Sequence, residues 1–185
     1  VLGAPSDCLA HVFLMEAYMY RCHPQTARLL ELLREKAIGD VRVIQATFSF
    51  QSKFNPASRL WSNDMAGGGI MDVGGYTTSI SRLVAGAAIG KPFAEPVAAT
   101  GAGVLQPETG VDAWAVATLK FGSGILANLS TGIGVGQENA VRIFGSGGWI
   151  HLPNPYVAVR EGACPGKIIV KRQGEKEPSE IVIDS

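Results

Sequence analysis

The sequence predicts an α+β fold in which an antiparallel sheet carries its helices on one face. The helical patterns lie in the first half of the chain, and the second half is a series of short strand-like runs separated by Gly, Pro and Asn. Helices followed by a run of strands are typical of this class. The 185 residues, 46% of them hydrophobic, suffice for one domain with a substantial core.

The first two elements expected are a strand and a helix. "VFLMEAY" (12–18) is a short apolar run typical of a buried strand. Residues 23–40 form the clearest helix, because Pro24 suits the first turn and leucines recur at helical spacing behind it. Gly39 stands where a helix commonly ends.

A second strand and a second helix follow. Residues 41–52 alternate between two sets of side chains, as strands do, although both sets are partly apolar. Residues 53–66 are expected to form a loop, and a helix is expected from about 72 to 85, ended by Gly86.

The second half is expected to supply the rest of the sheet. "KFGSGIL" (120–126) indicates a tight hairpin connection, and "FGSGGWI" (144–150) indicates a turn between strands. The strand candidates are 96–105, 111–121, 124–133, 140–152, 167–173 and 180–184.

Charge and composition exclude several functions. Sixteen basic residues balance sixteen acidic ones, so no bulk field attracts nucleic acid or an anionic membrane. No apolar run approaches the length of a membrane span, and the first residues lack the pattern of a signal peptide.

Cysteine and histidine usage bears on location and metals. Cys8, Cys22 and Cys164 are odd in number, far apart and without a CxxC pair, which favours reduced thiols and a cytoplasmic location. The three histidines offer no local pair of ligands, so we expect no metal site.

The stretch "GGGIMDVGGY" (67–76) carries the strongest candidate for catalysis. Asp72 and Tyr76 are four residues apart and would share one face of a helix. A phenol can exchange a proton with a substrate oxygen, and the carboxylate can orient that substrate. The alternative is that Asp72 caps the helix and Tyr76 merely packs. Gly74 and Gly75 each cost a helix about 1 kcal/mol relative to alanine, and they permit close approach of a ligand or another chain element.

Two more segments supply candidate binding residues. One lies where a strand is expected to pass into a helix, a position that often faces ligands in open α/β sheets; it holds Glu16, Tyr18, Tyr20, Arg21 and His23. A surface loop is the alternative, and His23 is more consistent with a helix start than with a catalytic base. The loop 53–66 carries Arg59 and Trp61, on which substrate identity would depend.

The glycine-rich string "GIGVGQ" (132–137) does not indicate nucleotide binding. It is only GxGxG, it opens no helix, and no acidic residue follows about 20 residues later in a βαβ unit.

Three stretches taken in order resemble the C-terminal domain of the Gfo/Idh/MocA oxidoreductases: "FLMEAYMYRCHPQ", "GGGIMDVGGYTTSISRLVAG" and "VDAWAVATLKFGSGILANLSTG". The resemblance runs from about residue 12 to the end, so 12–185 would be a substrate-binding and dimerisation domain and 1–11 an unmatched segment. It implies a large, open, mainly antiparallel sheet backed by helices, whose other face often builds a homodimer.

The resemblance also implies roles for the candidate residues. The aspartate at the position of Asp72 contacts substrate, and Tyr76 places the chain in the tyrosine branch, with the glucose–fructose oxidoreductases and dimeric dihydrodiol dehydrogenases. Tyr76 would be the acid/base of a carbonyl–alcohol interconversion, and Arg21 a second substrate-facing group. Gly74 and Gly75 would let the helix approach the nicotinamide of NAD or NADP. The substrate-binding set is Tyr20, Arg21, Arg59 and Trp61.

This chain departs from the family pattern in lacking the GxGxxG loop, the Glu-Lys-Pro segment and the usual C-terminal helix. We therefore expect the cofactor to be bound mainly by a Rossmann domain that this chain does not contain, and we expect the chain alone to be inactive. The function expected of the complete protein is NAD(P)-dependent oxidation or reduction of a sugar, polyol or related diol.

Two other functions stay open. One is a dimerising interaction module without catalysis, derived from such an enzyme. The other is a carbohydrate-binding protein that uses Trp61, Trp114 or Trp149 as stacking platforms, with Trp114 expected rather in the core.

Overall fold

One eight-stranded sheet forms the frame of the molecule, in a computed structural model that describes residues 17–156 and 166–183. The strand order is β2-β3-β4-β1-β5-β6-β7-β8. Neighbouring strands pair antiparallel except β1 and β4, which run parallel, so the prediction of an open, mainly antiparallel sheet is confirmed. The strands are β1 (Val41–Ser49), β2 (Pro96–Leu105), β3 (Asp112–Phe121), β4 (Leu126–Gly132), β5 (Ala140–Gly145), β6 (Gly148–Pro153), β7 (Gly166–Arg172) and β8 (Ser179–Ile183).

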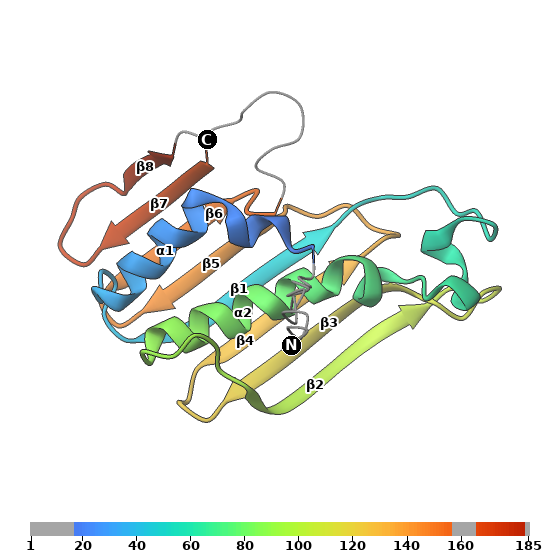
Figure 1. Cartoon of the computed structure of the whole chain (residues 1–185), viewed down its shortest axis with the longest axis horizontal. Coiled ribbons are helices and arrows are strands. Elements are labelled where there is room, and N and C mark those ends of the chain that lie inside the picture. The colour runs from blue at the N-terminus through green and yellow to red at the C-terminus, as the bar shows by residue number, and fades with distance from the viewer. Residues whose placement is uncertain (1–16, 157–165, 184–185) are drawn as a thin grey trace, which may run out of the picture.

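The helices lie together on one face of this sheet (Figure 1), as the sequence predicts. Among the described residues, the opposite face carries no helix. The helical elements are η1 (Met19–Cys22), α1 (Pro24–Arg34), η2 (Arg59–Trp61), η3 (Asn63–Met65), the π-helical turn η4 (Ile70–Gly74) and α2 (Gly75–Ala88).

The main core fills the space between the helices and the central strands. Burial of apolar surface there provides the dominant stabilisation of the fold. A smaller apolar cluster, made of Trp61, Val111, Ala113 and Ile133, anchors the loop before η4. Fully buried members of the main core include Leu29 and Leu32 of α1, Ile80 and Val84 of α2, Ile44 of β1, Ile143 of β5 and Ile150 of β6.

The first helix is shorter than the sequence predicts. It ends at Arg34 instead of continuing to residue 40, because Lys36 adopts a left-handed conformation with φ 53°. The amide of Lys36 donates to the carbonyl of Leu33, and the amide of Ala37 donates to that of Leu32. This is the Schellman pattern, with lysine in the position that glycine usually occupies.

The second helix begins earlier and ends later than predicted. The π-helical turn starts at Ile70, and α2 continues to Ala88. Gly86 does not end the helix; it allows Phe93 to approach, since a Cβ at this position would lie 2.5 Å from the Phe93 Cα.

The strand candidates of the second half are confirmed within one or two residues, and the stretch 140–152 divides into β5 and β6 around the predicted turn. The strand predicted at 12–18 falls largely outside the described residues, and Ala17 and Tyr18 are not in a strand. The segment 1–11, which the sequence left unmatched, lies entirely outside the described residues.

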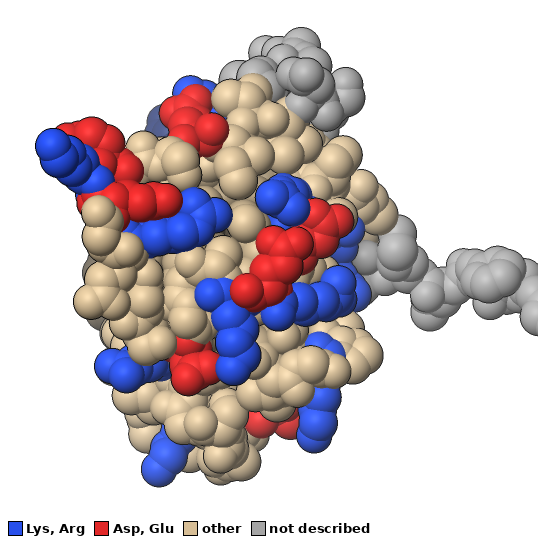
Figure 2. All heavy atoms as spheres, turned by 90° about the vertical axis from the view of Figure 1, so that its left-hand side faces the viewer, with Lys and Arg blue, Asp and Glu red and all other residues tan. Residues whose placement is uncertain are grey.

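Charged side chains of both signs alternate on the end of the molecule that lies at the left of Figure 1, as Figure 2 shows. This end therefore presents no extended surface of one charge, in agreement with the balanced composition.

Candidate functional site

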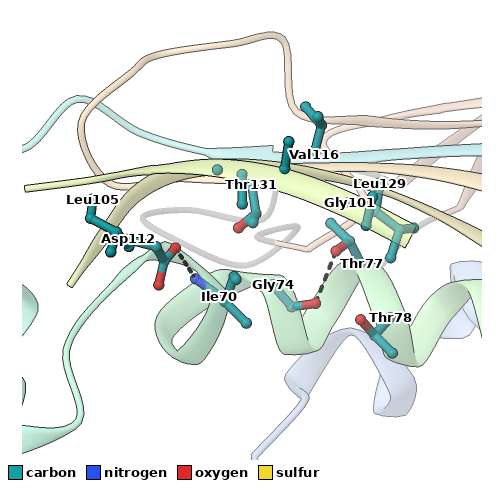
Figure 3. A pocket seen from close by; sticks show the side chains of 14 residues that line it. Ile70, Gly74, Thr77, Thr78, Gly101, Leu105, Asp112, Val116, Leu129 and Thr131 are labelled. Carbon is teal, nitrogen blue, oxygen red and sulfur yellow. Dashed lines mark hydrogen bonds between the residues drawn. The ribbon is translucent and has the colours of Figure 1, made fainter. Parts of the chain in front are cut away.

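The π-helical turn η4 is held in place from the sheet. The amide of Ile70 donates to Asp112 Oδ2 at 2.8 Å, at the start of β3 (Figure 3). Gly68 precedes the turn with φ 110°, and a Cβ there would lie 2.3 Å from Asp112 Oδ1. Burial raises the pKa of the Asp112 carboxyl, while backbone amide donors partly oppose that rise.

Two threonines complete this support. Thr131 of β4 donates its hydroxyl to the carbonyl of Gly69 at 3.0 Å, and Thr77 donates to the carbonyl of Gly74 at 2.9 Å. Between these groups and β2 lies a hollow of about 510 Å³, walled mainly by glycine, alanine and threonine (Figure 3). The turn that carries Asp72 is thus fixed by side chains from two strands.

Asp72 and Tyr76 line one hollow, as their spacing predicts. We call it the tyrosine hollow; its volume is about 420 Å³, and Arg59, Phe48 and Tyr156 also line it. Arg59 Nη2 donates to Asp72 Oδ1 at 2.7 Å. The Asp72 side chain is only 15% exposed, whereas that of Arg59 is 63% exposed, so the ion pair stands at the entrance with the carboxylate inward.

Tyr76 is positioned by aromatic neighbours. Its ring meets Tyr18 edge-on at 4.9 Å between centroids and Phe48 edge-on at 5.2 Å. Its hydroxyl donates to the carbonyl of Ala17 at 3.3 Å. Edge-to-face pairs of this kind fix the direction of a ring, so the phenol is held at a defined place in the hollow.

Tyr156 forms the back of the tyrosine hollow. Its ring stacks on Phe48 with 4.6 Å between centroids and lies 5.9 Å from that of Tyr76. The side chain is 1% exposed, and its hydroxyl has no hydrogen-bond partner among the described residues. Burial raises its pKa well above the ordinary value of 10, so this phenol stays protonated.

Arg21 lies in a different hollow. This second space, the arginine hollow, has a volume of about 490 Å³ and is lined by Arg21, Arg82 and Phe93 together with Gly74 and Gly75. The structure therefore divides the predicted residues into two groups on neighbouring faces of the η4–α2 helix.

Gly75 permits the close approach of another chain element. A Cβ at this position would lie 2.5 Å from the Tyr18 hydroxyl oxygen, and one at Gly74 would lie 3.4 Å from Thr131 Cγ2. Tyr18 thus occupies the space next to Gly75, while the backbone of both glycines lines the arginine hollow.

Tyr20 and Trp61 are buried. Tyr20 is 2% exposed and donates its hydroxyl to Ser79 Oγ at 2.9 Å; burial is the main reason that its pKa rises to about 12. Trp61 is 4% exposed, and its indole N–H donates to Ser52 Oγ at 3.3 Å. Both residues lie behind the hollows and support the side chains that line them.

The structure also tests what the sequence led us to expect of His23 and Trp114. His23 is the N-cap of α1 and accepts a hydrogen bond from the amide of Gln25, so the interpretation as a helix-start residue is confirmed. The expectation that Trp114 lies in the core is wrong, because its side chain is 42% exposed on β3.

The described residues contain no group of three or more His, Cys, Asp or Glu side chains that could hold a metal ion. Within the same residues, no helix is long and apolar enough to cross a membrane.

Comparison with protein families gives one match, to the GFO/IDH/MocA C-terminal domain, over residues 26–151, which is more than half of the chain. The chain belongs to this family. The resemblance in the sequence motifs is thereby confirmed, and the α+β sheet with helices on one face is the architecture of its GFO/IDH/MocA neighbours.

Several relatives in this family are named as oxidoreductases. An uncharacterized oxidoreductase of Rhizobium meliloti is 30% identical over 82% of this chain and 43% of its own length. The trans-1,2-dihydrobenzene-1,2-diol dehydrogenase of Sus scrofa is 30% identical over 90% of this chain and 45% of its own length. This chain thus spans less than half the length of each of these two relatives.

Solved structures agree with the fold. The 3-ketoreductase KijD10 of Actinomadura kijaniata, in complex with TDP-benzene and NADP, superposes with a TM-score of 0.79 at 22% identity, over 94% of this chain and 50% of that one. The aldose-aldose oxidoreductase of Caulobacter crescentus, complexed with glycerol, gives 0.73 at 25% identity, over 91% and 47%.

Three residues of the site were missed from the sequence, namely Asp112, Arg82 and Tyr156. Tyr18 belongs to the junction that the sequence singled out, and the structure places its hydroxyl beside Gly75. Asp112 could have been noticed as a polar residue that opens an apolar strand. Arg82 and Tyr156 carry no local signal, because only the tertiary fold brings them to η4.

Proposed function

We propose that this chain is the substrate-binding half of an NAD(P)-dependent oxidoreductase that acts on a sugar, a polyol or a related diol. The observation that carries the proposal is that Asp72, Arg59 and Tyr76 line one hollow of about 420 Å³. A carboxylate, a guanidinium and a phenol can together hold a polyhydroxylated substrate and exchange a proton with one of its oxygens. The family membership and the dehydrogenases among the relatives support this reading.

In this proposal Tyr76 exchanges the proton. Its phenol donates to the carbonyl oxygen as that oxygen becomes an alcohol, and the phenolate takes the proton back in the reverse direction. Asp72 accepts a hydrogen bond from a neighbouring substrate hydroxyl, and Arg59 holds the carboxylate in position at 2.7 Å. When bound, NAD or NADP supplies or accepts the hydride.

The cofactor would be held mainly by a dinucleotide-binding domain outside this chain. The glycine-rich string 132–137 follows β4 without opening a helix, so it does not form a phosphate-binding loop. Gly74 and Gly75 line the arginine hollow, and we propose that this side of the helix faces the nicotinamide ring, although Thr131 and Tyr18 occupy the space directly beside the two α-carbons. We propose that the isolated chain does not turn over substrate, and that the complete enzyme works in the cytoplasm.

The test is Tyr76→Phe in the complete protein, with reduction measured at saturating cofactor. We expect kcat to fall by about 100-fold or more, the usual contribution of a positioned acid–base group. Phenylalanine keeps the edge-on contacts with Tyr18 and Phe48, so the free energy of unfolding should stay close to that of the wild type. An unchanged kcat would remove the catalytic role and favour the non-catalytic interaction module.

We further propose a homodimer through the face of the sheet that the helices leave open. Large apolar side chains are exposed on β3 and β4, namely Trp114, Val116 and Leu126 at 42%, 55% and 41%. A surface of this kind is typical of an interface between subunits. Val116→Lys should convert a dimer into a monomer in analytical ultracentrifugation; a wild-type monomer at micromolar concentration would contradict the proposal.

A further inference from the structure

The arginine hollow concentrates positive charge beside the site. Arg21 comes from η1 and Arg82 from α2, and both reach the ring of Phe93. The guanidinium carbon of Arg21 lies 4.7 Å from the ring centroid, and that of Arg82 lies 5.5 Å from it. Each guanidinium makes a cation–π contact with this one ring, and both line the same hollow, where both charges would attract an anion.

The two guanidinium groups have spare hydrogen-bonding capacity. Arg82 pairs with Glu95, whose side chain is 71% exposed, but its Nε–H has no partner among the described residues. Arg21 forms none of the ion pairs found among the described residues, and it is exposed. Guanidinium groups that line a hollow with no acidic residue in its lining are typical of a site for an external acceptor.

The rest of the hollow adds donors, and Glu95, the acid that pairs with Arg82, is not among its lining residues. Tyr18, Thr78 and Ser79 line it with hydroxyl groups, and no Asp or Glu is among its lining residues. Tyr20 already donates to Ser79 Oγ, so the hydrogen of the Ser79 hydroxyl is left to donate elsewhere.

We propose that the arginine hollow binds a phosphate group. The planar guanidinium fork matches phosphate oxygens, and Arg21 together with Arg82, which is shared with the exposed Glu95, can neutralise a group that carries between one and two negative charges. A carboxylate would offer only two oxygens and one charge to the same set of donors. The phosphate belongs either to the substrate or to the nicotinamide end of the cofactor; that choice rests on the proposed function, whereas the phosphate site itself does not.

The experiment is calorimetric titration of this chain with inorganic phosphate at low ionic strength. Arg21→Gln should weaken binding by about tenfold, the loss expected for one charged hydrogen-bond partner. Glu95→Gln should strengthen it, because it removes the carboxylate that competes for Arg82. The matched controls are Arg28→Gln and Glu31→Gln, an arginine–glutamate pair on the outer face of α1 with similar exposure, and both should leave the affinity unchanged.

Equal effects of Arg21→Gln and Arg28→Gln would overturn the proposal, as would weaker binding in Glu95→Gln. Circular dichroism of each variant shows that a loss of binding is not a loss of folding.

A second titration identifies the source of the phosphate, with glucose 6-phosphate and reduced nicotinamide mononucleotide as probes. Tighter binding of the sugar phosphate than of inorganic phosphate assigns the group to the substrate, and tighter binding of the mononucleotide assigns it to the cofactor. Because no turnover is measured, inactivity of Tyr76→Phe or of the whole enzyme does not affect this result.

Discussion

The guanidinium of Arg59 lies 2.7 Å from the carboxylate of Asp72 and joins the loop 53–66 to the π-helical turn. The ion pair is partly exposed to solvent, because the Arg59 side chain is largely exposed whereas that of Asp72 is mostly buried. Exposed ion pairs add about 0–1 kcal/mol to stability, so the pair contributes little to folding. We infer that it orients the Asp72 carboxylate within the tyrosine hollow.

Arg59→Gln is therefore expected to separate activity from stability. In the complete protein, kcat/KM should fall by about tenfold, which corresponds to the loss of one charged hydrogen bond. The free energy of unfolding, measured with urea, should change by less than about 1 kcal/mol. Arg28→Gln removes a comparable pair with Glu31 and should alter neither quantity. A wild-type kcat/KM in Arg59→Gln would show that the ion pair plays no part in the site.

Gly75→Ala should destabilise the chain although alanine favours helices. The new Cβ would lie 2.5 Å from the Tyr18 hydroxyl oxygen, and overpacking of this kind costs about 1–3 kcal/mol. The next Tyr18 atom is 3.4 Å away, so Tyr18→Phe should rescue Gly75→Ala in urea unfolding. Gly136→Ala is the control, since its nearest neighbour is 4.0 Å away. A stability gain in Gly75→Ala alone would mean that Tyr18 does not occupy this space.

Tyr156→Phe should stabilise the chain by about 1 kcal/mol. The buried hydroxyl has no partner among the described residues, and an unsatisfied polar group carries its full desolvation cost. Tyr20→Phe is a matched control of opposite sign, because it removes the hydrogen bond to Ser79 and should destabilise by about 1 kcal/mol. Thermal unfolding of both variants measures the difference, and destabilisation in both would refute the assignment of an unpaired hydroxyl.

His151 should make stability depend on pH. Burial lowers the pKa of this imidazole below 6.5, nearby Arg142 lowers it further, and Glu138 opposes both. The Glu138 carboxylate is 3.8 Å from Nε2, too far for a hydrogen bond, and the facing residue on β7 is the apolar Ile169. The unfolded chain therefore binds the proton at a higher pH than the folded chain does.

The free energy of unfolding should therefore be highest above about pH 6.5, where His151 is neutral in both states. It should decrease as the pH falls from 6.5 through the lower pKa of the folded state, because the unfolded chain takes up the proton first. His151→Gln should flatten this part of a urea-unfolding profile measured between pH 7 and pH 5, while the stability at pH 7 changes little. The same slope in the variant would assign the pH dependence to other groups.

The sequence predicts the strands well and the ends of the helices poorly. Gly, Pro and Asn turns bound β2, β3 and β4, and local chemistry of that kind can be read directly. The end of α1 depends on a left-handed Lys36, which no propensity would suggest. Residues 35–40 were expected to continue the helix because the apolar Ile38 fits the helical spacing. Ile38 is indeed buried in the main core, but it packs there from the segment that follows the helix.

The candidate site was predictable along one helix only. Asp72 and Tyr76 share a hollow because their spacing alone brings them together. Arg21 was expected beside them, yet it faces the arginine hollow, since η1 turns it towards Phe93. Contacts between distant segments, such as that of Arg59 with Asp72, have no signature in a single sequence.

The parallel pairing of β1 with β4 has a consequence for folding. The strands β2 to β4 and β5 to β8 are each joined by short connections, whereas β1 lies between the two groups and pairs Val43 with Leu126 and Ile44 with Ile143. Docking β1 closes the longest loops in the sheet, and such closures slow folding. We expect the amides of β1 to show the slowest hydrogen exchange and those of β2 and β8 the fastest. In kinetic terms, we expect β1 to limit the rate at which two separately assembled meanders become one sheet.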